Sequence, residues 1–329
     1  MKKILLALLL SALLTLLLSS CSLPAENGAS VSDATGLIGE ELPTLRLSAA
    51  ENPQTLDAIL YFRFNEQSLL SCETRRLSLQ PNESAERAVV QALLDGPSAG
   101  IVDLHRLFPA NTRVINTIAQ EDSLVITFSA ALLDSFEEST PNRRRLAMDS
   151  LIATITENFA YTRVQILVDQ SDRTDGGSMR LSNTYYNDAR LSPGPAAPLY
   201  RDEAVLLTHK RTAEMIFEAW SQRDWQTLYT LILLRDSASQ EERPLRESAL
   251  NRLRSAPYLS AFSVSAGSVS PLGSSAVFSA EFSVIFDEHS HADIDAFPLR
   301  LTREGGIWKI SYTELMRLMQ MNDTEEYSG

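Results

Sequence analysis

Residues 81–97 read PNESAERAVVQALLDGP and predict one helix with both of its ends marked. Residues 81–84 open the helix with a capping side chain and an acidic side chain that complements the helix dipole. Gly96 and Pro97 end it, since proline cannot continue a helix. The face expected to be buried repeats at helical spacing and consists of Ala85, Ala88, Val89, Ala92 and Leu93.

Strands are predicted on both sides of this helix. Residues 56–64 and 69–79 precede it and indicate two strands joined by a turn. Residues 114–118 and 124–128 follow it, flank a polar turn and predict a hairpin.

A second helix is expected after Asn142. Its apolar stripe has three- and four-residue spacing and comprises Met148, Leu151, Ile152, Ile155 and Phe159. The alternating residues Val164, Ile166 and Val168 then predict a strand that closes this part of the fold.

In this order the segments resemble the GerMN domain family of sporulation and spore germination proteins. The resemblance covers about residues 55–182 and is carried by Tyr61-Phe62, Glu73–Arg76, Arg87–Pro97, Phe108–Thr112 and Leu124–Ser129. The turn at residues 121–123 departs from the family pattern, because a glycine is usual there. The resemblance implies a small α+β domain without an established catalytic centre, in proteins that are secreted or lipid-anchored. Domains of related fold act as modules that build rings or complexes at the cell envelope, so the resemblance also implies a role in assembly.

From about residue 202 the pattern predicts helices first and antiparallel strands after them, which is typical of an α+β domain. One long helix is expected over residues 203–223, with a stripe of Ala213, Ile216, Phe217 and Trp220. Shorter helices are expected at 224–234 and 244–254, and strands at 260–269, 276–286, 296–302 and 307–312. Over about residues 204–318 this order is similar to the nuclear transport factor-like cone fold, and that similarity implies a pocket between sheet and helix.

The first thirty residues predict the compartment. Lys2 and Lys3 precede an apolar stretch, residues 4–18, that is shorter than the about 20 residues of a membrane span and fits a secretory signal peptide. Leu18-Ser19-Ser20-Cys21 resembles the bacterial lipobox, which implies a diacylglyceryl group with palmitate-type chains on the Cys21 thiol. The chain is therefore expected to be lipid-anchored at the extracytoplasmic face of the cell membrane, and a second acyl signal would make that anchor stable.

Composition and the positions of proline and glycine divide the chain into six parts. They are a signal peptide at 1–20, a flexible tether at 21–54, a GerMN-like domain at 55–182, a Pro-rich linker at 183–201, a cone-like domain at 202–321 and a disordered tail at 322–329. A net charge of −13 argues against a nucleic-acid partner, whose binding site would be basic. Two cysteines make no disulfide framework, and Cys72 is expected to be a small buried side chain.

The motifs of phosphate, dinucleotide, zinc-protease and serine-hydrolase sites are absent from the sequence. We therefore predict no cofactor, no metal and no catalytic residue. Three groups of residues leave an alternative open. His289 and His291 could share a strand face beside acidic residues, although a polar hairpin tip is the favoured interpretation. Glu281 stands between Ala280 and Phe282, where it would face either a pocket as an acid or base, or solvent.

The third group is aromatic: Trp220, Trp225, Tyr229 and Trp308 could line a ligand pocket or fill the core. The sequence thus predicts a non-enzymatic lipoprotein that acts as an assembly or interaction module in sporulation, germination or envelope processes. Envelope or sporulation proteins are the expected partners, and homo-oligomer formation stays open. The alternative is a small-molecule or cell-wall binding module, which could be hydrolytic, that uses the C-terminal pocket. Aromatic side chains filling that pocket would exclude this alternative, whereas Glu281 or a histidine pointing into it would favour it.

Overall fold

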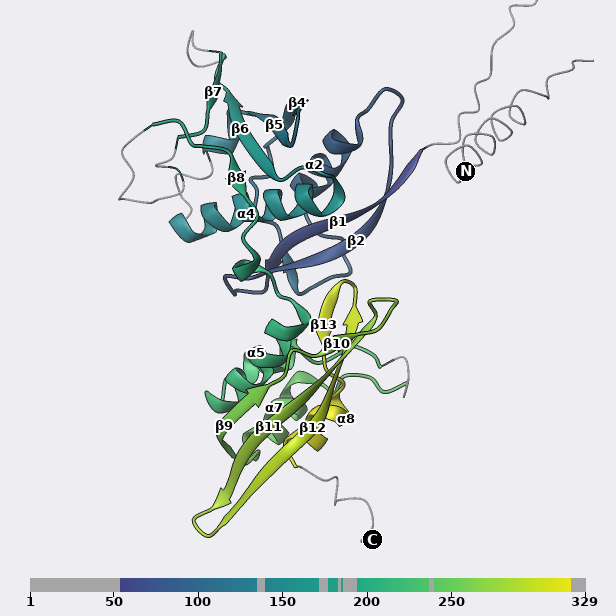
Figure 1. Ribbon diagram of the computed structural model, residues 1–329, viewed down its shortest axis with the longest axis vertical. Coiled ribbons are helices and arrows are strands. Elements are labelled where there is room, and N and C mark those ends of the chain that lie inside the picture. Colours follow the sequence, from purple (N-terminus) through teal and green to yellow (C-terminus); the bar gives the residue numbers. More distant parts are fainter. Residues whose placement is uncertain are drawn as a thin grey trace, which may run out of the picture. The chain divides into compact units, whose positions relative to one another are not determined.

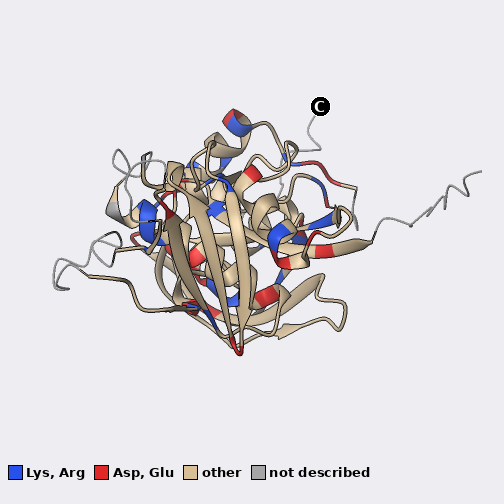
Figure 2. Cartoon of the chain, turned by 90° about the horizontal axis from the view of Figure 1, so that it is seen from above, with Lys and Arg blue, Asp and Glu red and all other residues tan. Residues whose placement is uncertain are grey.

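The computed structural model describes residues 54–134, 140–171, 177–182, 185, 194–236 and 240–320. The described residues belong to one compact unit, Glu51–Gly329. The compact unit combines helices with largely antiparallel sheets (Figure 1), which confirms the α+β class. Acidic and basic residues are interspersed over its described part (Figure 2). The signal peptide, Cys21, all of the tether except Gln54, most of the linker and the tail at 322–329 lie outside the described residues.

The first sheet has the strand order β2-β1-β3, and its pairs are antiparallel. The strands are β1 (Thr55–Phe64), β2 (Leu70–Ser78) and β3 (Leu104–His105). The two long strands confirm the predictions at 56–64 and 69–79. Alternate residues of β1 enter the core, because side chains of a strand point to opposite faces in turn; they are Ala58, Leu60, Phe62 and Phe64.

The second sheet has the order β4-β5-β6-β7, and β8 pairs with β6. Its strands are β4 (Val114–Gln120), β5 (Ser123–Ser129), β6 (Arg163–Asp169), β7 (Ser178–Arg180) and β8 (Leu199–Tyr200). The hairpin of β4 and β5 confirms the prediction, and Glu121 takes the left-handed conformation (φ 50°) where the family pattern has glycine.

Strand β6 does not close the sheet, which corrects the prediction. It runs parallel to β5 and pairs on its other side with β7 and, at its start, with β8. The sequence pattern missed β8 because the prolines before it are typical of a connector. Part of that proline-rich stretch is itself attached to the sheet, since the Ala196 N–H donates to the Leu181 carbonyl at 2.7 Å.

Helices α2 (Ala85–Asp95), α3 (Ala131–Asp134) and α4 (Pro141–Asn158) belong to the same part of the chain. Ser84 caps α2 by accepting a hydrogen bond from the Arg87 N–H, and Gly96 ends the helix at a φ of 91°, as the sequence predicts. Helix α4 begins earlier than expected, at Pro141, because a proline fits the first turn, where its missing N–H has no helical partner. Most of its predicted stripe is buried, namely Met148, Leu151, Ile152 and Ile155.

A row of polar side chains on α4 replaces a neighbouring strand along β1. The Ser150 hydroxyl donates to the Tyr61 carbonyl at 2.6 Å, and the Thr154 hydroxyl accepts from the Tyr61 N–H at 3.0 Å. One turn further on, Asn158 accepts from the Ile59 N–H at 2.9 Å and donates to the Ile59 carbonyl at 2.7 Å. The four-residue spacing places all three side chains on one helix face, so the backbone of β1 is satisfied where no strand covers it.

The C-terminal part contains a 3-10 turn and four helices among the described residues. They are Glu203–Val205, α5 (His209–Ser221), α6 (Trp225–Thr230), α7 (Arg246–Arg254) and α8 (Tyr312–Leu318). The single helix expected over 203–223 is therefore wrong in its first turns. The Leu207 N–H donates to the Leu70 carbonyl of β2 at 2.7 Å, and this pairing holds the chain extended until Thr208 caps α5.

The third sheet has the order β10-β11-β12-β13, and β9 pairs with β11. Its strands are β9 (Tyr258–Val264), β10 (Ser268–Val269), β11 (Ser275–Asp287), β12 (Ser290–Glu304) and β13 (Ile307–Lys309). All pairs are antiparallel, and β11 and β12 form a long hairpin. Strand β12 begins earlier than the predicted strand at 296–302, and α8 replaces the end of the one expected at 307–312.

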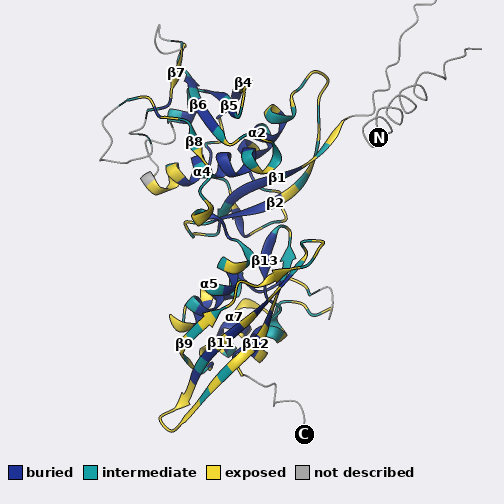
Figure 3. Ribbon diagram, viewed as in Figure 1, coloured by how far each residue is buried: buried dark blue, intermediate teal, exposed yellow. Residues whose placement is uncertain are grey.

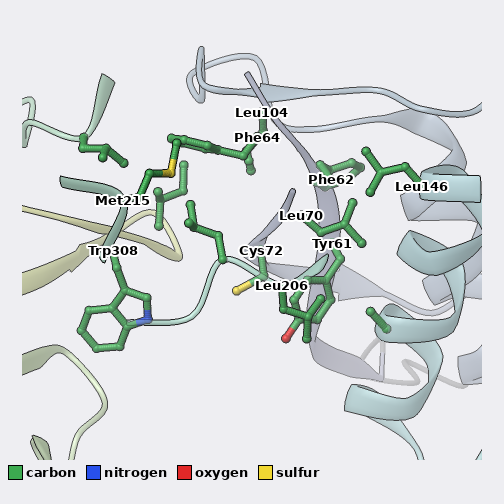
Figure 4. Packing of buried hydrophobic residues seen from close by; sticks show 14 of the residues in the cluster. Tyr61, Phe62, Phe64, Leu70, Cys72, Leu104, Leu146, Leu206, Met215 and Trp308 are labelled. Carbon is green, nitrogen blue, oxygen red and sulfur yellow. The ribbon is translucent and has the colours of Figure 1, made fainter. Parts of the chain in front are cut away.

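A buried ion pair joins β13 to the first part of the chain. The side chain of Lys309 is 2% exposed, and its Nζ lies 2.6 Å from Asp103 Oδ2 and 3.1 Å from Glu304 Oε2. Asp103 precedes β3, whereas Glu304 ends β12. Hydrophobic residues of both parts pack around this junction (Figure 4), and they belong to one continuous core.

The turn between β12 and β13 packs directly on the backbone of β2. Gly306 has a φ of 97°, and a Cβ atom at this position would lie 1.9 Å from the Cys72 carbonyl oxygen. The Arg303 guanidinium donates to Cys72 Sγ at 2.9 Å and to the Gly306 carbonyl at 3.1 Å. Only glycine allows this approach, because any side chain would push the turn away from β2.

We expect Gly306→Ala to lower the free energy of unfolding by about 3 kcal/mol, because the new methyl group overlaps the β2 backbone. Gly273→Ala is the matched control: its φ is 66°, but a Cβ atom there meets nothing within 4 Å. That control should cost only the conformational strain of about 1 kcal/mol. Urea unfolding followed by tryptophan fluorescence measures both, and equal losses would contradict the packing argument.

We expect Lys309→Met to cost about 3–5 kcal/mol, since it leaves the Asp103 carboxylate buried without its cation. Adding Asp103→Leu should restore at least half of that loss, because the remaining carboxylate, Glu304, also accepts from the Leu234 N–H. A double-mutant cycle from urea unfolding gives the coupling between the two residues. A double variant whose loss equals the sum of the losses of Lys309→Met and Asp103→Leu would show that the pair is not coupled.

Candidate functional site

The aromatic residues that could have lined a pocket fill the interior of the C-terminal part. Phe217 stacks on Phe262 at a centroid distance of 5.2 Å, and Phe282 meets Trp220 edge-on at 5.8 Å. The indole N–H of Trp220 donates to the Pro257 carbonyl at 2.9 Å. Trp225 and Trp308 are also buried, and Tyr229 is half-buried with its hydroxyl bonded to the Pro244 carbonyl. These side chains are core residues.

Glu281 lies on β11 with its side chain exposed, between the buried residues Ala280 and Phe282. Because strand residues alternate between faces, Glu281 points away from the aromatic interior. Glu281 is therefore not placed to act as an acid or base in that interior. The sequence left both faces open, since a single charged residue in an alternating strand does not reveal which face is covered.

His289 and His291 lie at the tip of the β11–β12 hairpin and are exposed. The His289 N–H donates to Asp287 Oδ1 at 2.8 Å, which shapes the tip as a polar turn. In the part of the chain that the structure describes, no three His, Cys, Asp or Glu residues are grouped to hold a metal ion. His209 instead packs against the rings of Phe278 and Trp308, and its burial lowers the pKa of the imidazole.

Cys72 is free and buried, as predicted. Burial raises the pKa of its thiol, although the Arg303 guanidinium beside it acts in the opposite direction. A raised thiol pKa keeps the nucleophilic thiolate scarce at neutral pH. The side chain therefore belongs to the packing between β2 and the β12–β13 turn.

The sequence analysis missed a groove on the outer face of the second sheet. Its volume is about 770 Å³, and its lining combines apolar residues of the sheet with polar ones from β4, β6 and β7; the main ones are Gln120, Val125, Arg163, Gln165, Leu167 and Arg180. Arg163 is held by Asp122, with Nη2 and Oδ1 2.7 Å apart. The signal in the sequence is the alternation along β6, where Arg163, Gln165 and Leu167 share the face opposite the buried valines.

A second groove, of about 610 Å³, lies in the C-terminal part. It is lined by outward-facing residues of β11 and β12 and by α8, with Arg300, Glu314 and Arg317 as its charged members beside Asp236. The groove is outside the aromatic interior, so it is a different place from the pocket that the cone resemblance implied.

Arg201, which follows β8, holds this part of the chain against α4, and we call this contact the clasp. Arg201 lies 2.6 Å from a carboxylate oxygen of Glu157 and 2.6 Å from one of Glu203, and its guanidinium stacks on Tyr61. On the same helix, the side chain of Asp149 is 11% exposed, and its Oδ2 accepts no hydrogen bond. Burial raises the pKa of Asp149 to about 6; Arg145 opposes this effect, and the nearby Asp202 adds to it. The clasp therefore contains a carboxyl group that titrates close to neutrality.

Cys21, the predicted site of the lipid anchor, lies outside the described residues. None of the helices that the structure describes is long and apolar enough to cross a membrane.

Residues 59–174 match the family model described as Germane, sporulation and spore germination. The match supports the resemblance of this part of the chain to the GerMN type of domain. No curated protein matches the chain.

Several solved structures are similar to parts of the chain. A protein of Clostridium perfringens assigned as a lipoprotein is 22% identical over 36% of this chain and 75% of its own, with a TM-score of 0.25. The first GerMN domain of the sporulation protein GerM from Bacillus subtilis is 16% identical over 44% of this chain and 98% of its own, with a TM-score of 0.31. The tandem GerMN domains of that protein are 16% identical over 45% of this chain and 46% of their own, with a TM-score of 0.30.

The raised pKa of Asp149 makes the stability of the clasp depend on pH. The unfolded chain ionises this carboxyl near pH 4 and the folded chain only near pH 6, so its contribution is full below pH 4 and is lost as the pH rises through 6. We expect Asp149→Asn to be more stable than the parent by about 2 kcal/mol at pH 8, with the difference vanishing at pH 4.

Urea midpoints at pH 4, 6 and 8 measure this difference. Asp169→Asn is the control, because a hydrogen bond from the Ser171 backbone lowers the pKa of the Asp169 carboxyl, and this variant should gain nothing at pH 8. An Asp149→Asn variant that is no more stable than the parent at pH 8 would show that the buried carboxyl carries no ionisation cost.

Proposed function

We propose that this chain is a lipid-anchored interaction module on the extracytoplasmic face of the cell membrane, with a role in sporulation or spore germination. The match of residues 59–174 to the Germane family carries the proposal, because the description of that family names these processes. The function is non-enzymatic in this proposal, and its partners are proteins of the envelope or of the sporulating cell.

The anchor is the lipid on Cys21, and it is proposed from the lipobox-like residues 18–21 after an apolar stretch. About thirty residues separate Cys21 from the start of the compact unit at Glu51. Such a spacer spans up to about 100 Å when stretched, so the compact unit can reach partners away from the lipid surface. We also propose that the C-terminal part is cone-like and serves assembly rather than chemistry, since its interior is packed with aromatic rings.

The groove on the outer face of β4–β7 supports an interaction role for the GerMN-type domain. It presents two arginines, Arg163 and Arg180, beside apolar residues of the sheet. Arg180 is exposed, whereas Arg163 is paired with Asp122, so Arg180 is the residue to change without disturbing the fold. Arg113 is an exposed arginine outside the groove lining and serves as a charge-matched control.

We expect Arg180→Glu to lower spore yield or germination at least threefold while the urea midpoint stays at the parent value, because the change reverses charge on the groove only. Arg113→Glu should leave both readouts unchanged. We further expect Cys21→Ala to move the protein from the membrane pellet to the supernatant and to reduce spore yield or germination to the level of a deletion strain.

Complementation of a deletion strain, with membrane fractionation of each variant, provides these measurements. A deletion strain that sporulates and germinates like the parent would contradict the proposed process. An unaltered protein found in the supernatant would contradict the proposed anchor.

A further inference from the structure

The far end of the β11–β12 hairpin extends beyond its neighbouring strands. Strand β9 accompanies β11 only as far as the pair of Tyr258 and Ile285, and β13 accompanies β12 only from Thr302. We call residues 285–295 the arm. All of them are exposed except Ala292 and Ile294, which are partly exposed, and Figure 3 shows this end of the hairpin as exposed.

The arm continues an apolar row that is buried elsewhere. Phe278, Ala280, Phe282 and Val284 face the aromatic interior along β11 and are buried. Phe286 follows them and is 45% exposed. A register shift between Ile285 and Asp287 marks a bulge at Phe286, and bulges re-aim side chains at the end of a ladder.

A second apolar pair lies beside the bulge. Ile285 is 40% exposed, and its partner on β9, Tyr258, is 62% exposed. The guanidinium of Arg223 lies over the Tyr258 ring at 4.5 Å, so the tyrosine is held in place on one side. Exposed large apolar side chains that are rimmed by polar ones mark interaction sites on soluble domains.

The rim of the arm is acidic. Asp287, Glu288, Asp293 and Asp295 lie within eleven residues, and the sequence contains no lysine or arginine between Arg254 and Arg300. The arm is also ordered by its own polar contacts: the Ser283 hydroxyl donates to Asp293 Oδ1 at 2.6 Å, and the His289 N–H donates to Asp287. A preordered acidic and apolar surface favours a partner of opposite charge, because binding then costs little conformational entropy.

We propose that the arm docks into an apolar pocket that is ringed by lysine or arginine residues on another protein, with Phe286 and Ile285 as the anchors. This inference rests on the proposed function as an interaction module and adds the surface and the kind of partner. Charge decides among the occupants: a second copy of the arm would bring like charges together, and an anionic lipid surface would repel the same four carboxylates.

The test places a photo-crosslinking amino acid at position 286 of the full chain in its native host. Position 272 is the control, because Leu272 is apolar and 90% exposed but lies outside the arm. Position 118, on β4 of the GerMN-type domain, reports whether the chain has protein partners elsewhere, since Ile118 is also exposed. Mass spectrometry then identifies each crosslinked peptide, and the urea midpoint of each variant confirms folding.

We expect position 286 to give a discrete protein whose crosslinked segment is basic, and position 272 to give none. Glu288→Lys with Asp295→Lys should lower the crosslink yield at position 286 at least tenfold, because they reverse the rim charge. Glu242→Lys with Glu247→Lys, exposed acidic residues outside the arm, should leave the yield within twofold of the parent.

Four results would overturn the inference. They are a crosslink at 286 to a second copy of this chain, a crosslink to lipid, a crosslinked segment that is neutral or acidic, and a yield no higher than at position 272. If position 286 gives no partner but position 118 does, the arm is not a docking surface while the proposed interaction function stands. If neither position gives a partner during growth or sporulation, the interaction function fails as well.

Discussion

The buried ammonium of Lys309 is the constraint on which the junction of the two parts depends. Burying a lysine side chain is costly unless carboxylates face it, and Asp103 and Glu304 supply them from opposite sides of the junction. The Gly306 backbone meets the carbonyl of Cys72 at the same turn, so charge and shape fix one position. The Leu207 N–H adds a backbone bond to β2. Residues that the sequence assigns to two domains therefore share one core.

Local patterns predicted the elements that depend on their own side chains. Ser84 caps the start of helix α2 and Gly96 its end, and β1, β2 and the β4–β5 hairpin follow their alternation. The errors occur where distant partners decide. Leu206 and Leu207 have helical neighbours in sequence, but pairing with Leu70 keeps them extended. Strand β8 forms only because β6 offers it an edge, a contact that no local pattern contains.

The structure corrects the predicted site residues more than it corrects the predicted fold. Sequence reasoning named residues by type, so Glu281, His289 and the tryptophans stood out as potential chemistry. The faces on which they lie decide otherwise: the tryptophans are buried, and Glu281 and His289 are exposed. The groove beside Arg163 contains no such marker residue, and the histidines of the acidic arm pointed to a metal site rather than to a docking surface. The groove and the arm are surfaces assembled across strands, and the register that creates them becomes visible only when the strands are paired.

The polar row on α4 has a consequence for how the chain avoids misassembly. A strand that lies beside another strand can slip by two residues, because the backbone repeats. The polar row on α4 consists of Ser150, Thr154 and Asn158 alone. If α4 moved by one turn along β1, backbone amide groups of Ile59 and Tyr61 would be left buried without hydrogen-bond partners. The same three side chains occupy the hydrogen-bonding groups that an intruding strand would seek. Strand β1 has no lysine or proline to protect this edge. Helix α4 covers the edge instead and so protects it from pairing with a strand of another chain.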